Sequence, residues 1–204
     1  MRRAERSAAS ADRRGFLVGS VVALAGVGLT ACASGAATAD AAVPNDADLG
    51  FCTDMAFHHE QAVAMCQRVL GADTGGAVQN SAAEILQNQS YERGLMHAWL
   101  AEWGQSTAPP DTVMGWMGME TPAASMPGLA THAQMRRLAE LTGIEKGREF
   151  LELMRAHHVG GVHMADAAVD AVAITRVSTL AQQMSRQQTY EISLFDDLLT
   201  GLYA

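Results

Sequence analysis

The second half of this 204-residue chain repeats the first half at a constant offset of 99 residues. Eight identities share this single register. Phe51, Met55, His58, His59, Met65, Gln89, Tyr91 and Glu92 recur as Phe150, Met154, His157, His158, Met164, Gln188, Tyr190 and Glu191. Because each set of identities extends across a break in the apolar pattern, the repeat indicates a duplicated structural unit rather than one duplicated helix.

Apolar residues recur at helical spacing in four stretches, and no stretch shows the sustained alternation of a strand. The stretches are 48–70, 77–104, 147–171 and 174–202. Each half is therefore predicted to be an αα-hairpin, and two hairpins make an all-α, four-helix bundle. Residues 105–146 form a connector rich in Met, Gly and Pro, in which 130–142 are expected to form a short helix that ends at Gly143.

The N-terminal segment is typical of an export signal. Residues 1–31 contain a basic segment, a short apolar run and then small residues. The sequence Arg13-Arg14-Gly15-Phe16-Leu17 resembles the twin-arginine export signature. Leu29-Thr30-Ala31-Cys32 resembles a lipobox, which predicts that Cys32 is lipidated; the alternative is an ordinary thiol in a cleaved signal. Residues 32–47 are then a flexible tether, and 48–204 form the bundle at the extracytoplasmic face of the cell membrane.

Charge and cysteine content restrict the possible partners. Residues 1–31 carry a net charge of +3, so the remaining 9 basic and 20 acidic side chains give −11. An acidic chain is poorly suited to nucleic acid and weakly attracts cations. Cys52 and Cys66, if they lie on one helix, are separated by about 21 Å, too far for a disulfide.

The duplicated histidine pairs are the candidate functional residues. On a helical wheel, Met55, His58 and His59 share one face, so the His pair is expected to point into the core, as is its copy at 157–158. His97 and His163 lie off these faces. A hairpin turn centred near residue 74 would place Gln89 level with His59 and Glu92 one turn further along, and the second hairpin would repeat this. Four histidines, two glutamines (Gln89 and Gln188) and two glutamates (Glu92 and Glu191) are thus predicted to converge.

Two interpretations of this convergence stay open. An unpaired buried polar group costs about 1–3 kcal/mol, so the side chains either bond one another and fix the helix register or bind a cation. Imidazole suits copper, zinc, iron and nickel, and thioether selects Cu(I). Met55 and Met154 precede His59 and His158 by one helical turn and are candidate ligands. Two further methionines, Met65 and Met164, are expected to pack in the core. The connector methionines either collect Cu(I) or form an apolar plug over the end of the bundle; they are Met114, Met117, Met119 and Met126.

The pattern Phe51-x3-Met55-x2-His58-His59-x2-Ala62-x2-Met65, followed by Gln89-x2-Glu92-x3-Met96-x2-Trp99-Leu100, resembles the bacterial "domain of unknown function 305" family, as does the second copy. The resemblance implies a ferritin-like bundle and an association with copper binding or copper resistance outside the cytoplasm. It makes His58, His59, His157 and His158, with Met55 and Met154, the candidate ligands. The two copies depart from each other in two places. Gly160-Gly161 is expected to loosen the second helix, and Cys66, with Ala165 as its counterpart, is expected to be core first and ligand second.

The sequence therefore predicts a membrane-tethered protein that sequesters or transfers copper, as Cu(I) or Cu(II), in preference to zinc or iron. A copper donor or acceptor protein is a possible partner, and no catalysis is required. One alternative is a ferritin-like dimetal oxidase that uses Glu92 and Glu191, although the ferritin pattern requires Glu-x-x-His and this chain has Gln-x-x-Glu. Another is a structural or partner-binding bundle without metal.

Overall fold

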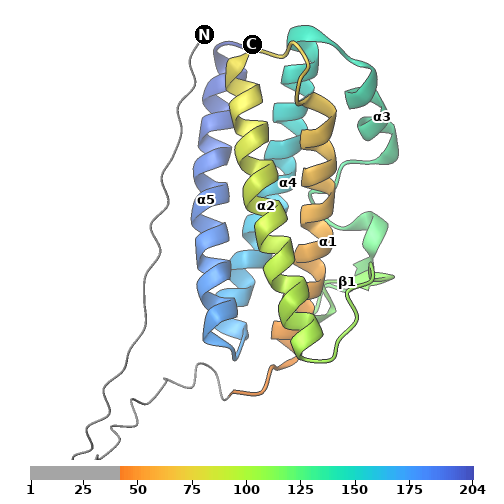
Figure 1. Ribbon diagram of the computed structural model, residues 1–204, viewed down its shortest axis with the longest axis vertical. Helices are drawn as coiled ribbons and strands as arrows, with labels where there is room; N and C mark the ends of the chain where they lie inside the picture. The colour runs from red at the N-terminus through yellow and green to blue at the C-terminus, as the bar shows by residue number, and fades with distance from the viewer. Residues whose placement is uncertain (1–41) are drawn as a thin grey trace, which may run out of the picture. The chain divides into compact units, whose positions relative to one another are not determined.

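The computed structural model describes residues 42–204, which form the predicted four-helix bundle (Figure 1). α1 and α2 make one hairpin, and α4 and α5 make the other. The long helices are α1 (Asp46–Val69), α2 (Gly76–Glu102), α4 (Gly143–Ala171) and α5 (Thr175–Thr200). None of the helices in the described part is long and apolar enough to cross a membrane. The predicted export signal, the lipidation site at Cys32 and most of the tether lie outside the described residues.

The start of α1 ties the two hairpins together. Asn45 caps the helix by accepting from the Asp48 N–H, and the Asp48 carboxylate accepts from the Asn45 N–H, which completes a capping box. The fully buried Asp48 carboxylate also accepts from the backbone N–H groups of Ala173 and Ile174, in the turn between α4 and α5. One side chain therefore satisfies backbone donors at the ends of both hairpins.

A polar layer divides the core into two apolar clusters. The first cluster surrounds the start of α1 and the end of α4, and includes Phe51, Met55, Met96, Met164 and Met184. The second surrounds the end of α1 and the start of α4, and includes Met65, Ile85, Phe150, Met154 and Phe195. The buried polar residues between them are His58, His59, Gln89, His157, His158, Gln188 and Glu191. Met65 and Met164 pack in the core, as predicted.

The connector packs along the outer side of α1 (Figure 1). It contains β1 (Thr112–Val113), paired antiparallel with β2 (Thr121–Pro122), the 3₁₀ turns η1 (Gly115–Met117) and η2 (Ala123–Ser125), and α3 (His132–Glu140). Met114 and Met126 are buried in the first apolar cluster, whereas Met119 is 47% exposed. Met117 also packs against this cluster, so three of the four connector methionines cover apolar core, as the apolar-plug interpretation expects.

Two glycine predictions differ from the structure. Gly143 does not end α3, which stops at Glu140; it begins α4 with a positive φ of 59°. Nor does Gly160-Gly161 loosen α4, which continues unbroken to Ala171. A Cβ on Gly160 would lie 2.5 Å from the Pro127 carbonyl oxygen, and one on Gly161 would collide with the Gln188 side chain. The two glycines thus permit close packing against α4.

Candidate metal centre

The four predicted histidines form a row across the middle of the bundle. All four are fully buried, as the wheel predicted. The ring centroids of His59 and His58, both on α1, are 6.4 Å apart, and those of His157 and His158, both on α4, are 6.1 Å apart. The central rings, His58 and His157, stack with centroids 3.6 Å apart and planes inclined by 28°. The duplication therefore brings its two halves into contact at these rings.

Each outer histidine is bonded to a glutamate from the second helix of its own hairpin. The Nε2 atom of His59 lies 2.9 Å from Oε2 of Glu92, and that of His158 lies 2.5 Å from Oε2 of Glu191. The carboxylates accept these bonds. Glu92, which was predicted one helical turn beyond the level of His59, is therefore the residue bonded to this ring, whereas Oε1 of Gln89 has no partner among the described residues.

These bonds define the tautomers of three rings. In their neutral form, His59 and His158 carry the proton on Nε2 and donate it to the carboxylates. His157 donates from Nε2 to the backbone carbonyl oxygen of His58 at 2.9 Å, so it has the same tautomer. In each of the three rings, Nδ1 is left with a lone pair. Metal-binding histidines commonly have this arrangement, in which a carboxylate or carbonyl accepts from one nitrogen and the other faces the ion.

The layer contains a concentration of buried polar atoms without partners among the described residues. They are Nδ1 of His59, His157 and His158, both ring nitrogens of His58, and Oε1 of Gln89 and Gln188. Buried polar atoms are nearly always satisfied, so each such atom calls for a partner. A cation would satisfy lone pairs of this kind, and the donor set of neutral imidazoles suits copper or zinc. The residues present therefore fit a bound metal chemically.

Burial keeps the central imidazoles neutral. Desolvation is the main cause that lowers the pKa of His58 well below its usual 6.5, followed by the neighbouring His157, His59 and His158. Desolvation and the adjacent His158 likewise lower the pKa of His157, although its bond to the His58 carbonyl acts in the opposite direction. A neutral imidazole retains the lone pair that ligation requires.

The geometry also limits where an ion could bind. At a separation of 3.6 Å, the stacked rings of His58 and His157 leave no space for an ion between their faces. Among residues 42–204, no three or more His, Cys, Asp or Glu side chains are arranged to hold a metal. Met55 and Met154 are fully buried but belong to different apolar clusters, on opposite sides of the layer. The two methionines therefore lie on opposite faces of the polar layer rather than together.

The cysteines lie away from this chemistry. Cys52 and Cys66 are both on α1, buried and free. Burial, with a smaller contribution from the charge of Glu191, raises the pKa of the Cys66 thiol to about 12. The thiolate is the form that ligates metals, and it is therefore disfavoured at neutral pH. Cys66 packs in the second apolar cluster, which agrees with the prediction that it is first of all a core residue.

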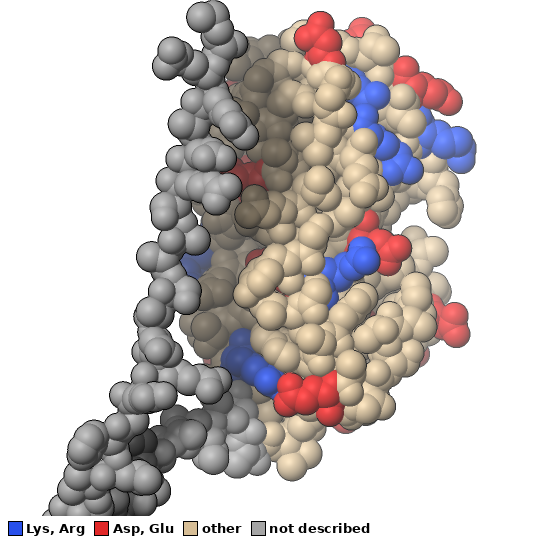
Figure 2. Space-filling view, viewed as in Figure 1, with Lys and Arg blue, Asp and Glu red and all other residues tan. Residues whose placement is uncertain are grey.

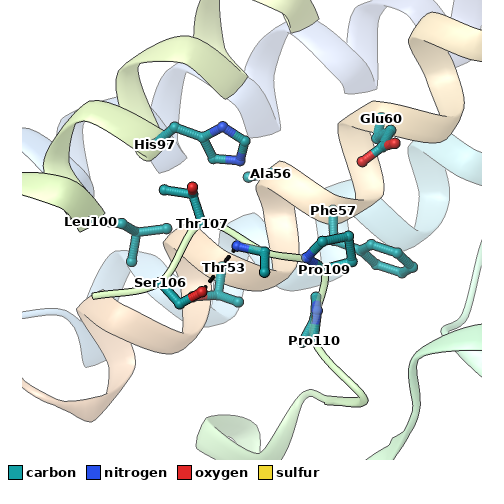
Figure 3. Close-up of a pocket in the computed structure, with 11 residues that line it drawn as sticks. Thr53, Ala56, Phe57, Glu60, His97, Leu100, Ser106, Thr107, Pro109 and Pro110 are labelled. Atoms are coloured by element: carbon teal, nitrogen blue, oxygen red, sulfur yellow. Dashed lines mark hydrogen bonds between the residues drawn. The ribbon is translucent and has the colours of Figure 1, made fainter. Parts of the chain in front are cut away.

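A polar pocket between α1 and α2 is separate from the histidine layer (Figure 3). His97 and Glu60 line it from the two helices, and residues 106–110 close one side. Desolvation lowers the pKa of His97, while the charge of Glu60 opposes this shift. His97 is therefore off the core face, as predicted, and His163 is exposed.

Sequence reasoning did not identify the residues that fix the connector. The Asp54 carboxylate accepts from the Met114 N–H at 2.7 Å and from the Trp116 indole N–H at 2.9 Å. The Gln61 amide donates to the Ala130 carbonyl at 2.9 Å and accepts from the Ala130 N–H at 2.6 Å. The partners in these contacts are 60 to 69 residues apart in the sequence, and one partner of each lies in the irregular connector, where no periodicity predicts a contact. The capping box was not predicted either, although the pattern Asn45-x-x-Asp48 is a sequence signal that could have found it.

Comparisons with known proteins agree with this architecture. The family model "Domain of unknown function (DUF305)" matches residues 48–199. The chain belongs to the DUF305 family. A DUF305 protein from Streptomyces coelicolor, described as secreted, is 40% identical, with a TM-score of 0.70, and the match covers 76% of this chain and 92% of that one. A DUF305 fragment from Deinococcus radiodurans is 28% identical, with a TM-score of 0.66 and coverage of 78% and 99%.

A further solved relative of this DUF305 chain is CopM. Its Cu(II)-bound form is 25% identical, with a TM-score of 0.60, and the match covers 76% of this chain and 97% of CopM. Its Cu(I)-bound form is matched at 22% identity with a TM-score of 0.58, covering 77% and 98%, and at that level it supports the fold alone. No curated protein matches the chain.

Proposed function

We propose that this DUF305 protein binds copper in the histidine layer and sequesters or transfers it outside the cytoplasm, tethered to the cell membrane through a lipid on Cys32. The likeness to a protein solved with Cu(II) bound supports the choice of metal. The family member described as secreted, together with the export-type N-terminal sequence, supports the location. Figure 2 shows mainly uncharged surface with small mixed groups of acidic and basic side chains, and no broad basic area for nucleic acid on that face.

The orientation of the imidazoles carries this proposal. Three rings donate from Nε2 to a carboxylate or carbonyl oxygen and keep a buried, unpartnered Nδ1 lone pair. His58, His59, His157 and His158 would hold copper through such nitrogens, with Glu92 and Glu191 orienting the two outer rings. Met55 and Met154 offer thioethers one turn from an outer histidine, which would favour Cu(I). The protein would only ligate the copper, because storage and transfer need no chemical reaction.

Metal competition tests the proposal. The protein is purified anaerobically, equilibrated with equal copper, zinc and iron, desalted and analysed for metal content. We expect the wild type to retain copper in preference to zinc and iron. A His58→Phe/His157→Phe variant, which keeps an aromatic pair at the stacked position, should lose most of it. A His97→Gln/His163→Gln variant, changed outside the layer, should retain copper like the wild type.

Two outcomes would contradict copper binding. Retention of iron, with oxygen consumption, would indicate the dimetal oxidase. Absence of any retained metal in the wild type would indicate a purely structural layer. The ring stack and the two His–Glu bonds favour this second candidate, because they already join α1 to α2 and to α4, and α4 to α5. In that case the Phe variant would change the free energy of unfolding but no metal content.

A further inference from the structure

A groove between α2 and α5 reaches the polar layer from solvent. These helices lie side by side in Figure 1. The groove is lined by Asn88, Glu92, Gln183, Arg186 and Gln187. Its volume is about 380 Å³. Glu92 lies in the groove lining and is bonded to the buried His59, so a single side chain links solvent to the row of imidazoles.

The two repeats differ at this point. In the second repeat, Gln187 Nε2 donates to Glu191 Oε1 at 2.9 Å, while the other carboxylate oxygen accepts from His158. The counterpart of Gln187 in the first repeat is Asn88, which also lines the groove but is one methylene shorter. Within residues 42–204, the Glu92 carboxylate accepts a hydrogen bond from His59 alone.

Exposure follows the same difference. The Glu92 side chain is 15% exposed, whereas that of Glu191 is 9% exposed and does not line the groove. Residues four apart on a helix are neighbours, so a Gln at the first position reaches a Glu at the second, while an Asn falls short. One glutamate therefore has both oxygens engaged by the protein, and the other keeps an oxygen available to the groove.

We propose that cations enter the histidine layer through the α2–α5 groove, and that Glu92 is the carboxylate that receives them, because Asn88 leaves its second oxygen free while Gln187 occupies that of Glu191. This inference rests on the proposed copper-binding function. Glu92 is then a positioning residue for His59 and also the point of entry, whereas Glu191 serves only to position His158. The two halves of the duplicated site are unequal in access, although their His–Glu pairs are alike.

The charges that line the groove affect how a cation is captured there. Its lining contains one carboxylate, Glu92, and one guanidinium, Arg186. These charges offset each other at long range, so capture depends on contact with the free carboxylate oxygen rather than on attraction from a distance.

Exchanging the two amide residues between repeats tests the inference. Asn88→Gln should engage the second oxygen of Glu92, and Gln187→Asn is its matched converse. In metal-free protein, deuterium exchange at the imidazole Cε1 position, resolved by mass spectrometry, reports solvent access without copper. We expect His59 to exchange faster than His158 in the wild type. Asn88→Gln should slow His59 several-fold, and Gln187→Asn should accelerate His158.

Copper transfer provides the second readout. Cu(I) is presented as its bicinchoninate complex, and the loss of its absorbance is followed with time. Asn88→Gln should slow uptake at least threefold and leave the final amount transferred unchanged. Uptake and His59 exchange that match the wild type would overturn the inference. Failure of the wild type to take copper from any competitor would instead overturn the proposed function, and the exchange measurements would still decide whether the groove gives access.

Discussion

His58 and His157 show how a residue that is polar in sequence becomes part of a core. Both rings are fully buried, they stack on each other, and burial lowers the pKa of each well below 6.5. In the folded protein they stay neutral under conditions in which the unfolded chain binds a proton at each ring. The unfolded state therefore takes up more protons as the pH falls below 6.5, and protonation favours unfolding.

We therefore expect the metal-free protein to lose stability as the pH falls from about 6.5 to 5. The contribution of these two histidines is fully present above 6.5 and decreases by about 1.4 kcal/mol per group for each pH unit below it. Urea unfolding at several pH values measures this slope. His58→Phe/His157→Phe should flatten it, whereas the exposed His163→Gln should not. An unchanged slope in the Phe variant would show that other groups cause the acid sensitivity.

At the scale of the elements, the sequence predicted the helices and the polar layer because both follow from periodicity. The register of His58 and His59 on the wheel fixed their burial, and the 99-residue offset gave the second pair. The stacking of the central rings and the tautomers depend on how α1 and α4 meet, which no pattern within either helix specifies. For the same reason, Gly160 was wrongly predicted to loosen its helix. In the structure it permits contact with a segment more than 30 residues away in the sequence.

The helical glycines give a matched pair of substitutions. Gly160→Ala places a Cβ 2.5 Å from the Pro127 carbonyl oxygen. Because the nearest atoms of the connector, in Pro127 and Gly128, are backbone atoms, the connector must shift. We expect a loss of about 1–3 kcal/mol, despite the higher helix propensity of alanine. Gly94→Ala, at an exposed position of α2 with no atom within 4 Å of the added Cβ, should instead stabilise by about 0.5–1 kcal/mol. Urea unfolding measures both, and equal effects would mean that the connector does not constrain α4.

For the bundle domain as a whole, the connector completes the first apolar cluster. Val113, Met114, Ala123 and Met126 are buried against side chains from the long helices. Asp54 and Gln61 anchor it at two points along α1, so the segment most irregular in sequence is held by specific hydrogen bonds. Opening of the connector would expose apolar core without separating the hairpins, and the two processes can be measured separately.

Gln61→Glu is the change that should open the connector alone. A carboxylate can still accept from the Ala130 N–H, but it cannot donate to the Ala130 carbonyl and instead faces that oxygen. The lost bond and the unsatisfied carbonyl should cost about 1–3 kcal/mol locally. Amide hydrogen exchange should therefore accelerate about tenfold or more across residues 126–131, with little change at the centres of α2 and α5. Gln67→Glu, at an exposed position of α1, provides the matched control. Faster exchange throughout all four long helices would show instead that the connector and the bundle unfold as one unit.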